Sequence, residues 1–126
     1  MKQELELELV KKYPNLYKEY GGDPAKTCMA WGIACGDGWY KLIDELSAKL
    51  EPLGVVAAQV KEKFGGLRFY LETGSEEAWD LVSKAEEQSF KTCERCGKQG
   101  RPRGGGWITT LCDECQDDIM TKKENN

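Results

Sequence analysis

The chain has 126 residues, 40% hydrophobic and 32% charged, which fits one small globular domain with an attached module and argues against disorder. A formal net charge of −4 argues against a surface devoted to nucleic-acid phosphates, and the lack of histidine excludes serine–histidine and cysteine–histidine nucleophile pairs. No apolar run reaches membrane-span length, and residues 1–10 alternate Glu with Leu unlike a signal peptide, so we expect a cytoplasmic protein.

The N-terminal third is predicted to hold one helix followed by a loop. Apolar side chains recur at helical spacing at four positions: Leu5, Leu9, Val10 and Tyr13. The alternation of Leu5, Leu7 and Leu9 also fits a strand. We favour a helix, because Glu, Leu and Lys are good helix formers and Pro14 supplies a stop. Residues 15–34 lack a regular period and contain a Gly-Gly-Asp-Pro turn signal, which predicts a loop.

Two further helices are predicted in the middle of the chain. The first has five apolar residues on one face: Trp39, Leu42, Ile43, Leu46 and Leu50. Asp37 stands where a helix N-cap is expected, and Pro52 ends the helix. The other begins at Ser75 and runs to about Phe90, with two glutamates near the positive end of its dipole.

Strands at 55–64 and 67–72 are predicted to form a hairpin around the dipeptide Gly65-Gly66. This register turns Phe64 and Glu62 toward the apolar face and directs five side chains outward: Gln59, Lys61, Lys63, Arg68 and Tyr70. Lys63 then lies opposite Arg68, and two such cations repel unless an anion, an acidic partner or an intramolecular carboxylate faces them. The outward residues are therefore a candidate partner-binding face, and a solvated sheet face is the alternative.

Four cysteines near the C-terminus have the spacing of a zinc site. Cys93 and Cys96 form one C-x2-C pair, Cys112 and Cys115 form another, and fifteen residues separate the pairs. Each pair is expected to form a tight knuckle, and Gly97 can adopt the positive φ that such a turn needs. Four thiolates form a closed set, which predicts one structural Zn²⁺ ion; disulfides, a redox pair and an iron–sulfur cluster are the alternatives.

These elements predict an α+β fold, with helices packed on a β-hairpin or small antiparallel sheet and a C-terminal zinc ribbon. We expect residues 1–91 to form the α+β body, residues 92–120 the ribbon packed on it, and residues 121–126 a frayed tail. Cys28 and Cys35 match no ligand spacing and are expected to be packed, inert thiols, with a disulfide or a reactive thiol as alternatives.

Charge is unevenly distributed along the predicted ribbon. Residues 91–111 carry an excess of four positive charges, and the residues after Leu111 carry an excess of three negative charges. A basic segment with an exposed aromatic is typical of nucleic-acid binding, so the candidate residues for that alternative are Arg95, Lys98, Arg101, Arg103 and Trp107.

Three blocks of the sequence carry a resemblance to a known family. They are the Cys35-Gly36-Asp37-Gly38-Trp39 element, the segment 59–70 (QVKEKFGGLRFY), and the C-terminal ribbon that begins Cys93-x2-Cys96-Gly97. Together they resemble a widespread family of small uncharacterised proteins of phages, prophages and bacterial genomes, over about residues 13–115. The resemblance implies a mobile-element context and zinc at the four ribbon cysteines. Similar members often have His where Cys115 stands and Glu where Ala34 stands.

The residues predict a small non-enzymatic zinc-binding protein, and the resemblance implies a phage or prophage type. It would act in the cytoplasm of a bacterial host cell by binding a host protein, such as a defence or regulatory factor, without a membrane or a small-molecule cofactor. The first alternative is a nucleic-acid-binding zinc-ribbon protein. The lesser alternative is an enzyme that uses Glu62, Asp37 or Cys35 in a pocket beside the hairpin, although these scattered groups form no catalytic constellation and no cofactor motif accompanies them.

Overall fold

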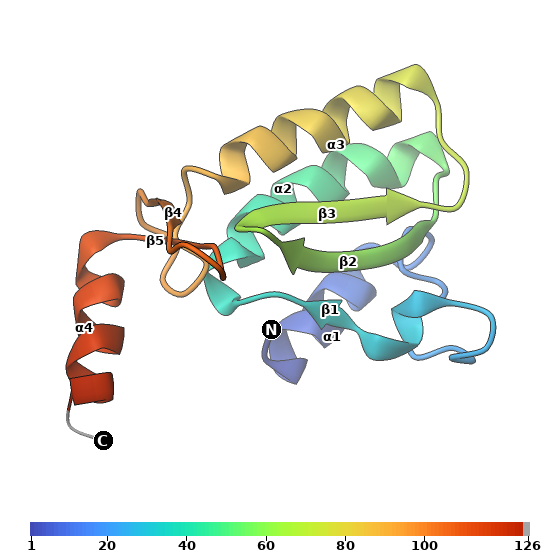
Figure 1. Cartoon of the computed structure of the whole chain (residues 1–126). Helices are drawn as coiled ribbons and strands as arrows, with labels where there is room; N and C mark the ends of the chain where they lie inside the picture. The colour runs from blue at the N-terminus through green and yellow to red at the C-terminus, as the bar shows by residue number, and fades with distance from the viewer. Residues whose placement is uncertain (125–126) are drawn as a thin grey trace.

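The computed structural model describes the backbone of residues 1–124 and the side chains of residues 1–120. Within these residues the fold is α+β, as predicted (Figure 1). The helices are α1 (Gln3–Lys12), α2 (Tyr40–Leu50), α3 (Glu76–Ser89) and α4 (Asp113–Glu124). The strands are β1 (Ile33–Ala34), β2 (Ala57–Lys63), β3 (Gly66–Leu71), β4 (Arg101–Arg103) and β5 (Thr109–Leu111). No helix of the described chain combines the length and apolar character that crossing a bilayer requires. Of the frayed tail predicted at 121–126, residues 121–124 belong to α4 and residues 125–126 lie outside the described residues.

The three helices predicted in the body are confirmed as α1, α2 and α3. Ser75 caps α3, because its Oγ accepts a hydrogen bond of 3.2 Å from the Ala78 amide. The predicted cap of α2 is wrong: Asp37 lies in a 3₁₀ turn (Asp37–Trp39) before that helix, and its carboxylate accepts from the Lys2 amide at 2.8 Å. Helix α2 begins instead as a continuation of this turn.

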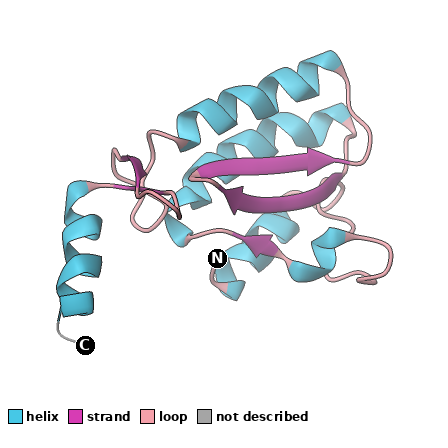
Figure 2. Cartoon of the chain, in the orientation of Figure 1, coloured by secondary structure: helices cyan, strands magenta, loops and turns pink. Residues whose placement is uncertain are grey.

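The predicted loop at 15–34 contains two short elements that the sequence did not reveal. A 3₁₀ helix spans Cys28–Trp31, and β1 follows it and pairs in parallel with β2 through Ile33 and Val60. The sheet order is β1-β2-β3, so an antiparallel hairpin carries one short parallel strand on its edge (Figure 2). A strand of two residues has no measurable period, which explains why the pattern missed it.

The hairpin forms, but its turn and register differ from the prediction. The turn residues are Phe64 and Gly65, both with positive φ (54° and 84°), and Lys63 pairs with Gly66. Lys61, not Lys63, therefore lies opposite Arg68. The predicted inward orientation of Phe64 is also wrong, because its side chain is 61% exposed at the tip of the hairpin.

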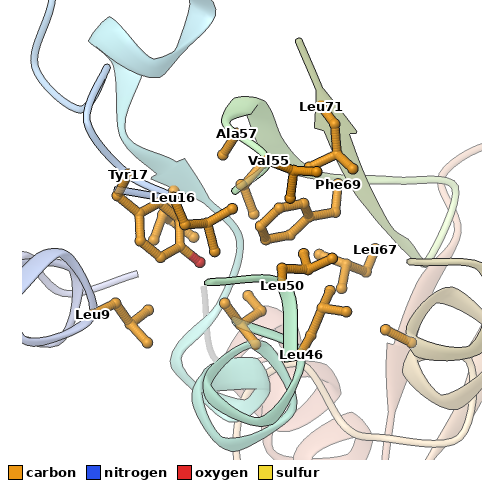
Figure 3. Close-up of a cluster of buried hydrophobic side chains, with 14 of the residues drawn as sticks. Leu9, Leu16, Tyr17, Leu46, Leu50, Val55, Ala57, Leu67, Phe69 and Leu71 are labelled. Carbon is orange, nitrogen blue, oxygen red and sulfur yellow. The ribbon is translucent and has the colours of Figure 1, made fainter. Parts of the chain in front are cut away.

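The main core lies between the sheet and the helices, where α3 contacts both β3 and α2 (Figure 3). Trp39 and Phe69 are fully or almost fully buried, as the amphipathic patterns predict. Tyr17, from the irregular segment, is also buried, and its hydroxyl forms a 2.6 Å hydrogen bond with Ser47. A second, small cluster contains Cys93, Leu111 and Cys112 in the ribbon. The ribbon therefore buries few apolar side chains of its own.

Candidate metal centre

Four cysteine sulfurs converge in the ribbon, at the positions that the sequence predicts. The Sγ atoms of Cys93, Cys96, Cys112 and Cys115 all lie within 4.8 Å of one another, so the cluster can hold a metal ion. The Sγ atoms of Cys96 and Cys112 are 3.5 Å apart. All six cysteines of the chain are free thiols, including Cys28 and Cys35. Cys28 is exposed and Cys35 is buried, and neither belongs to the cluster.

The first pair of cysteines lies on a tight knuckle. The Gly97 amide donates to the Cys93 carbonyl at 2.9 Å, and the Cys93 amide donates to the Lys98 carbonyl at 2.7 Å. Gly97 has a φ of 82°, which an L side chain rarely adopts. The expected role of this glycine in the knuckle is therefore confirmed.

The second pair occupies the start of α4, where the sequence predicts another knuckle. Strand β5 leads to Cys112, and Cys115 lies in the first turn of α4. The Cys115 amide donates to the Cys112 Sγ at 3.4 Å, and the Gln116 amide donates to the Cys112 carbonyl at 3.1 Å. The Cys112 sulfur thus accepts a hydrogen bond at the N-terminal end of α4.

The pKa values of the Cys93 and Cys115 thiols shift in opposite directions. Burial opposes ionisation of Cys93, but backbone hydrogen bonds from Cys112, Cys96 and Arg95 outweigh it and lower the pKa of Cys93 to about 7. Burial and the neighbouring thiols Cys112 and Cys96 raise the pKa of Cys115. Thiolates this close together repel one another unless a cation lies between them, so the donor set suits a bound metal ion.

The loop 35–39 is the platform on which the first knuckle lies. Two of its amides donate to Glu94: Gly36 to the carboxylate Oε2 at 2.8 Å and Gly38 to the carbonyl at 2.7 Å. The Trp39 indole Nε1 donates to the Thr92 carbonyl at 2.8 Å. A Cβ atom at Gly36 would lie 2.3 Å from the Glu94 carbonyl oxygen, so only glycine permits this close approach. Burial raises the pKa of the Glu94 carboxyl, although the Gly36 amide opposes the shift.

The hairpin tip contacts the other side of the ribbon. Thr110 of β5 is buried, and its hydroxyl donates to the Gly65 carbonyl at 2.6 Å. A Cβ atom at Gly66 would lie 2.5 Å from the Phe90 ring, so this glycine serves packing beside the turn. Two of the blocks that carry the family resemblance, loop 35–39 and segment 59–70, thus both contact the third, which is the ribbon. The contacts of Glu94 and Thr110 join residues far apart in the sequence, so no periodic pattern in the sequence predicts them. The glycines of loop 35–39 and of the hairpin turn are the one sequence feature that is typical of such close backbone approach.

The five residues predicted to face outward do not form one uniform cationic face. Arg68 is half-buried, and its Nη1 lies 3.0 Å from Glu86 Oε1 on α3, which is the intramolecular carboxylate among the predicted alternatives. Gln59 pairs in the sheet with the exposed Tyr70, and Lys61 pairs with Arg68. Lys63 is exposed beside the turn.

Of the three residues named in the enzyme alternative, Glu62 and Asp37 accept hydrogen bonds from the backbone, and Cys35 is a buried thiol. The Glu62 carboxylate accepts from the Gly65 amide at 2.8 Å and so stabilises the turn. Burial raises the pKa of the Cys35 thiol to about 12, which keeps the sulfur protonated at neutral pH. Asp37 holds the Lys2 amide, as described above.

The basic residues of the ribbon are largely matched by acids of α4. Three pairs join them: Arg95 with Asp118 at 3.2 Å, Lys98 with Glu114 at 3.1 Å, and Arg103 with Asp113 at 2.5 Å. Arg101 is exposed on β4, and Trp107, in the loop between β4 and β5, is 80% exposed. Three of the five cations of segment 91–111 are thus paired with acids of α4.

Comparisons of the chain with protein-family models, with curated proteins and with solved structures gave no match.

Proposed function

We propose that the four-cysteine cluster binds one Zn²⁺ ion and that this ion has a structural role. Four thiolate ligands suit Zn²⁺ and leave no coordination position for a substrate or a reactive water. Structural zinc sites contribute about 10–16 kcal/mol of apparent binding free energy at neutral pH, as much as the whole stability of a small domain. The small apolar cluster of the ribbon supports this proposal, because little else would hold the ribbon together.

Metal analysis of the purified protein tests the zinc proposal. We expect one zinc per chain, and Co²⁺ exchange should give the sulfur-to-cobalt charge-transfer and visible bands of a tetrahedral thiolate site. Two disulfides in a metal-free protein, or the visible absorption of an iron–sulfur cluster, would contradict it.

The protein then acts as a non-enzymatic binding protein, and its partner is a protein of the bacterial host. The observation that carries this proposal is the pair of exposed aromatic side chains, Phe64 and Trp107, next to a ribbon in which three cations pair with acids of α4. Exposed aromatics are enriched where proteins bind one another. The structural contacts of Glu62 and Asp37 support a role without catalysis. The phage or prophage origin rests on the resemblance of the three sequence blocks.

Nucleic-acid binding is the second candidate, and the exposure of Trp107 favours it. It requires affinity that falls steeply as salt rises. The internal ion pairs of Arg95, Lys98 and Arg103 count against it, because each would have to break before its cation could bind phosphate.

Affinity purification from lysates of a bacterial host separates the two candidates. The zinc-loaded protein should retain one host protein reproducibly and in near-stoichiometric amount, as native mass spectrometry would show. The binding proposal would be overturned by the absence of any reproducible partner. Salt-sensitive binding to DNA or RNA in its place would favour the second candidate.

A further inference from the structure

A cleft lies between the tip of the hairpin and the loop that joins β4 to β5. It encloses about 300 Å³, and its lining includes Lys61, Glu62, Lys63, Phe64, Trp107 and Ile108. We call it the tip cleft. Its walls come from two parts of the chain that are more than 40 residues apart in sequence, and the Thr110–Gly65 hydrogen bond joins them. The tip cleft is therefore a product of ribbon docking.

The two aromatic side chains of the tip cleft are exposed and belong to neither hydrophobic cluster. Phe64 is 61% exposed and Trp107 is 80% exposed. Among the described residues, Phe64 is the one non-glycine with positive φ, and a bulky side chain is unfavourable there. Hairpin turns with positive φ at both positions prefer Asn or Gly at the first. A strained and exposed phenylalanine indicates that this position serves contact with another molecule.

The rim of the tip cleft is positive. Lys61 and Lys63 form no ion pair within the described chain, and the Lys63 Nζ lies 5.5 Å from the Phe64 ring centroid. The one acid in the lining, Glu62, already accepts a hydrogen bond from the Gly65 amide. An occupant with negative charge would complement this rim, and an apolar group would fill the space between the rings.

We propose that the tip cleft binds an acidic segment of a partner protein. An apolar side chain of that segment inserts between Phe64 and Trp107, and its flanking carboxylates face Lys61 and Lys63. This proposal rests on the protein-binding function proposed above and names the surface and chemistry of that function. A protein segment suits the surface better than a nucleic acid, because three of the ribbon cations, Arg95, Lys98 and Arg103, already pair with acids of α4 and would have to break those pairs to contact a phosphate backbone.

Selection from a random 12-residue peptide display library on the zinc-loaded protein tests the proposal. We expect selected peptides to carry Asp or Glu next to Leu, Phe or Trp. Affinity of one such synthetic peptide should fall by about tenfold or more in Trp107→Ala and in Lys61→Glu/Lys63→Glu. Two control variants, Trp31→Ala and Lys26→Glu, should change the affinity by less than about twofold, because both residues are exposed outside the tip cleft.

Replacing Phe64 separates binding from folding. Phe64→Asn suits the turn better, so the urea midpoint should hold or rise while peptide affinity falls by about tenfold. Selection of peptides without acidic residues would overturn the proposal, as would peptides that bind all variants equally. Preferential binding of a 12-nucleotide oligo-dT at the tip cleft would also overturn it. A host protein that Trp107→Ala retains fully would refute the tip cleft alone and leave the binding function intact.

Discussion

Replacing Gly38 with alanine tests whether docking of the ribbon on loop 35–39 stabilises the molecule. An added Cβ would lie 2.3 Å from the Cys93 carbonyl oxygen and 2.6 Å from the carbonyl carbon and oxygen of Glu94. Real Cβ atoms essentially never come so close to backbone atoms. Because the knuckle also carries two of the proposed zinc ligands, it cannot move away without displacing Cys93.

The cost of this change follows from two terms. Forcing a methyl group into a filled space costs about 1–3 kcal/mol. Displacing the knuckle also lengthens the 2.7 Å hydrogen bond from the Gly38 amide to the Glu94 carbonyl, which is worth about 1 kcal/mol. We expect the free energy of unfolding of the zinc-loaded protein to fall by about 2–4 kcal/mol.

Urea unfolding followed by circular dichroism at fixed free zinc measures this loss. Gly105→Ala is the matched control, because an added Cβ there meets nothing within 4 Å and the backbone does not have positive φ. The control should lose less than about 0.5 kcal/mol. The docking argument is refuted if Gly38→Ala is as stable as the control.

Three further changes test the metal centre, the hairpin contact and an ion pair of the body. In Cys115→Ser, the zinc content per chain after dialysis against a chelator should fall from one to near zero. Hydrogen exchange should then show that residues 93–112 lose protection and that α2 keeps it. Full retention of zinc would contradict the ligand assignment. Thr110→Val keeps the side-chain shape but leaves the Gly65 carbonyl without its buried donor, so urea unfolding should show a loss of about 1–2 kcal/mol, which Thr109→Val should not reproduce. Burial alone would raise the pKa of the Asp44 carboxyl, but hydrogen bonds from Tyr13 and Lys12 outweigh burial and lower it. The stabilisation that the Asp44 carboxylate contributes is therefore present above the ordinary pKa of Asp and is lost as pH falls through the lower folded pKa. Asp44→Asn should therefore cost about 1 kcal/mol at pH 7 and progressively less as the pH falls below the ordinary pKa of Asp, and a loss that does not change with pH would refute this reasoning.

The helices could be predicted because their signals are local. The buried face of α2 with Ile43, Leu46 and Leu50 needs only a period of 3.6 residues, and Ser75 caps α3 through a bond to a residue three positions later. The predicted cap at Asp37 was wrong for a reason outside this local pattern. Its carboxylate binds the Lys2 amide, 35 residues away, and no window around Asp37 contains that partner.

The hairpin turn shows the same limit in more detail. Gly65-Gly66 is a favoured turn sequence, but Gly66 is needed beside the Phe90 ring, where a side chain would lie 2.5 Å from it. The turn therefore moves back to Phe64 and Gly65. The like-charged pair predicted at Lys63 and Arg68 is instead Lys61 and Arg68, and Glu86 of α3 forms an ion pair with Arg68.

The four-cysteine cluster could be predicted because the spacing of its cysteines is visible in the sequence, whereas the surfaces around it could not be predicted. The proposed zinc ion would hold β5 and the first knuckle together, and these contact the hairpin tip through Thr110 and the loop 35–39 through Glu94. Both walls of the tip cleft depend on that docking, since Trp107 belongs to the ribbon and Phe64 to the hairpin. A metal ion that never touches the partner would therefore decide whether the binding surface exists, and binding should follow zinc occupancy even though no ligand of the ion contacts the peptide.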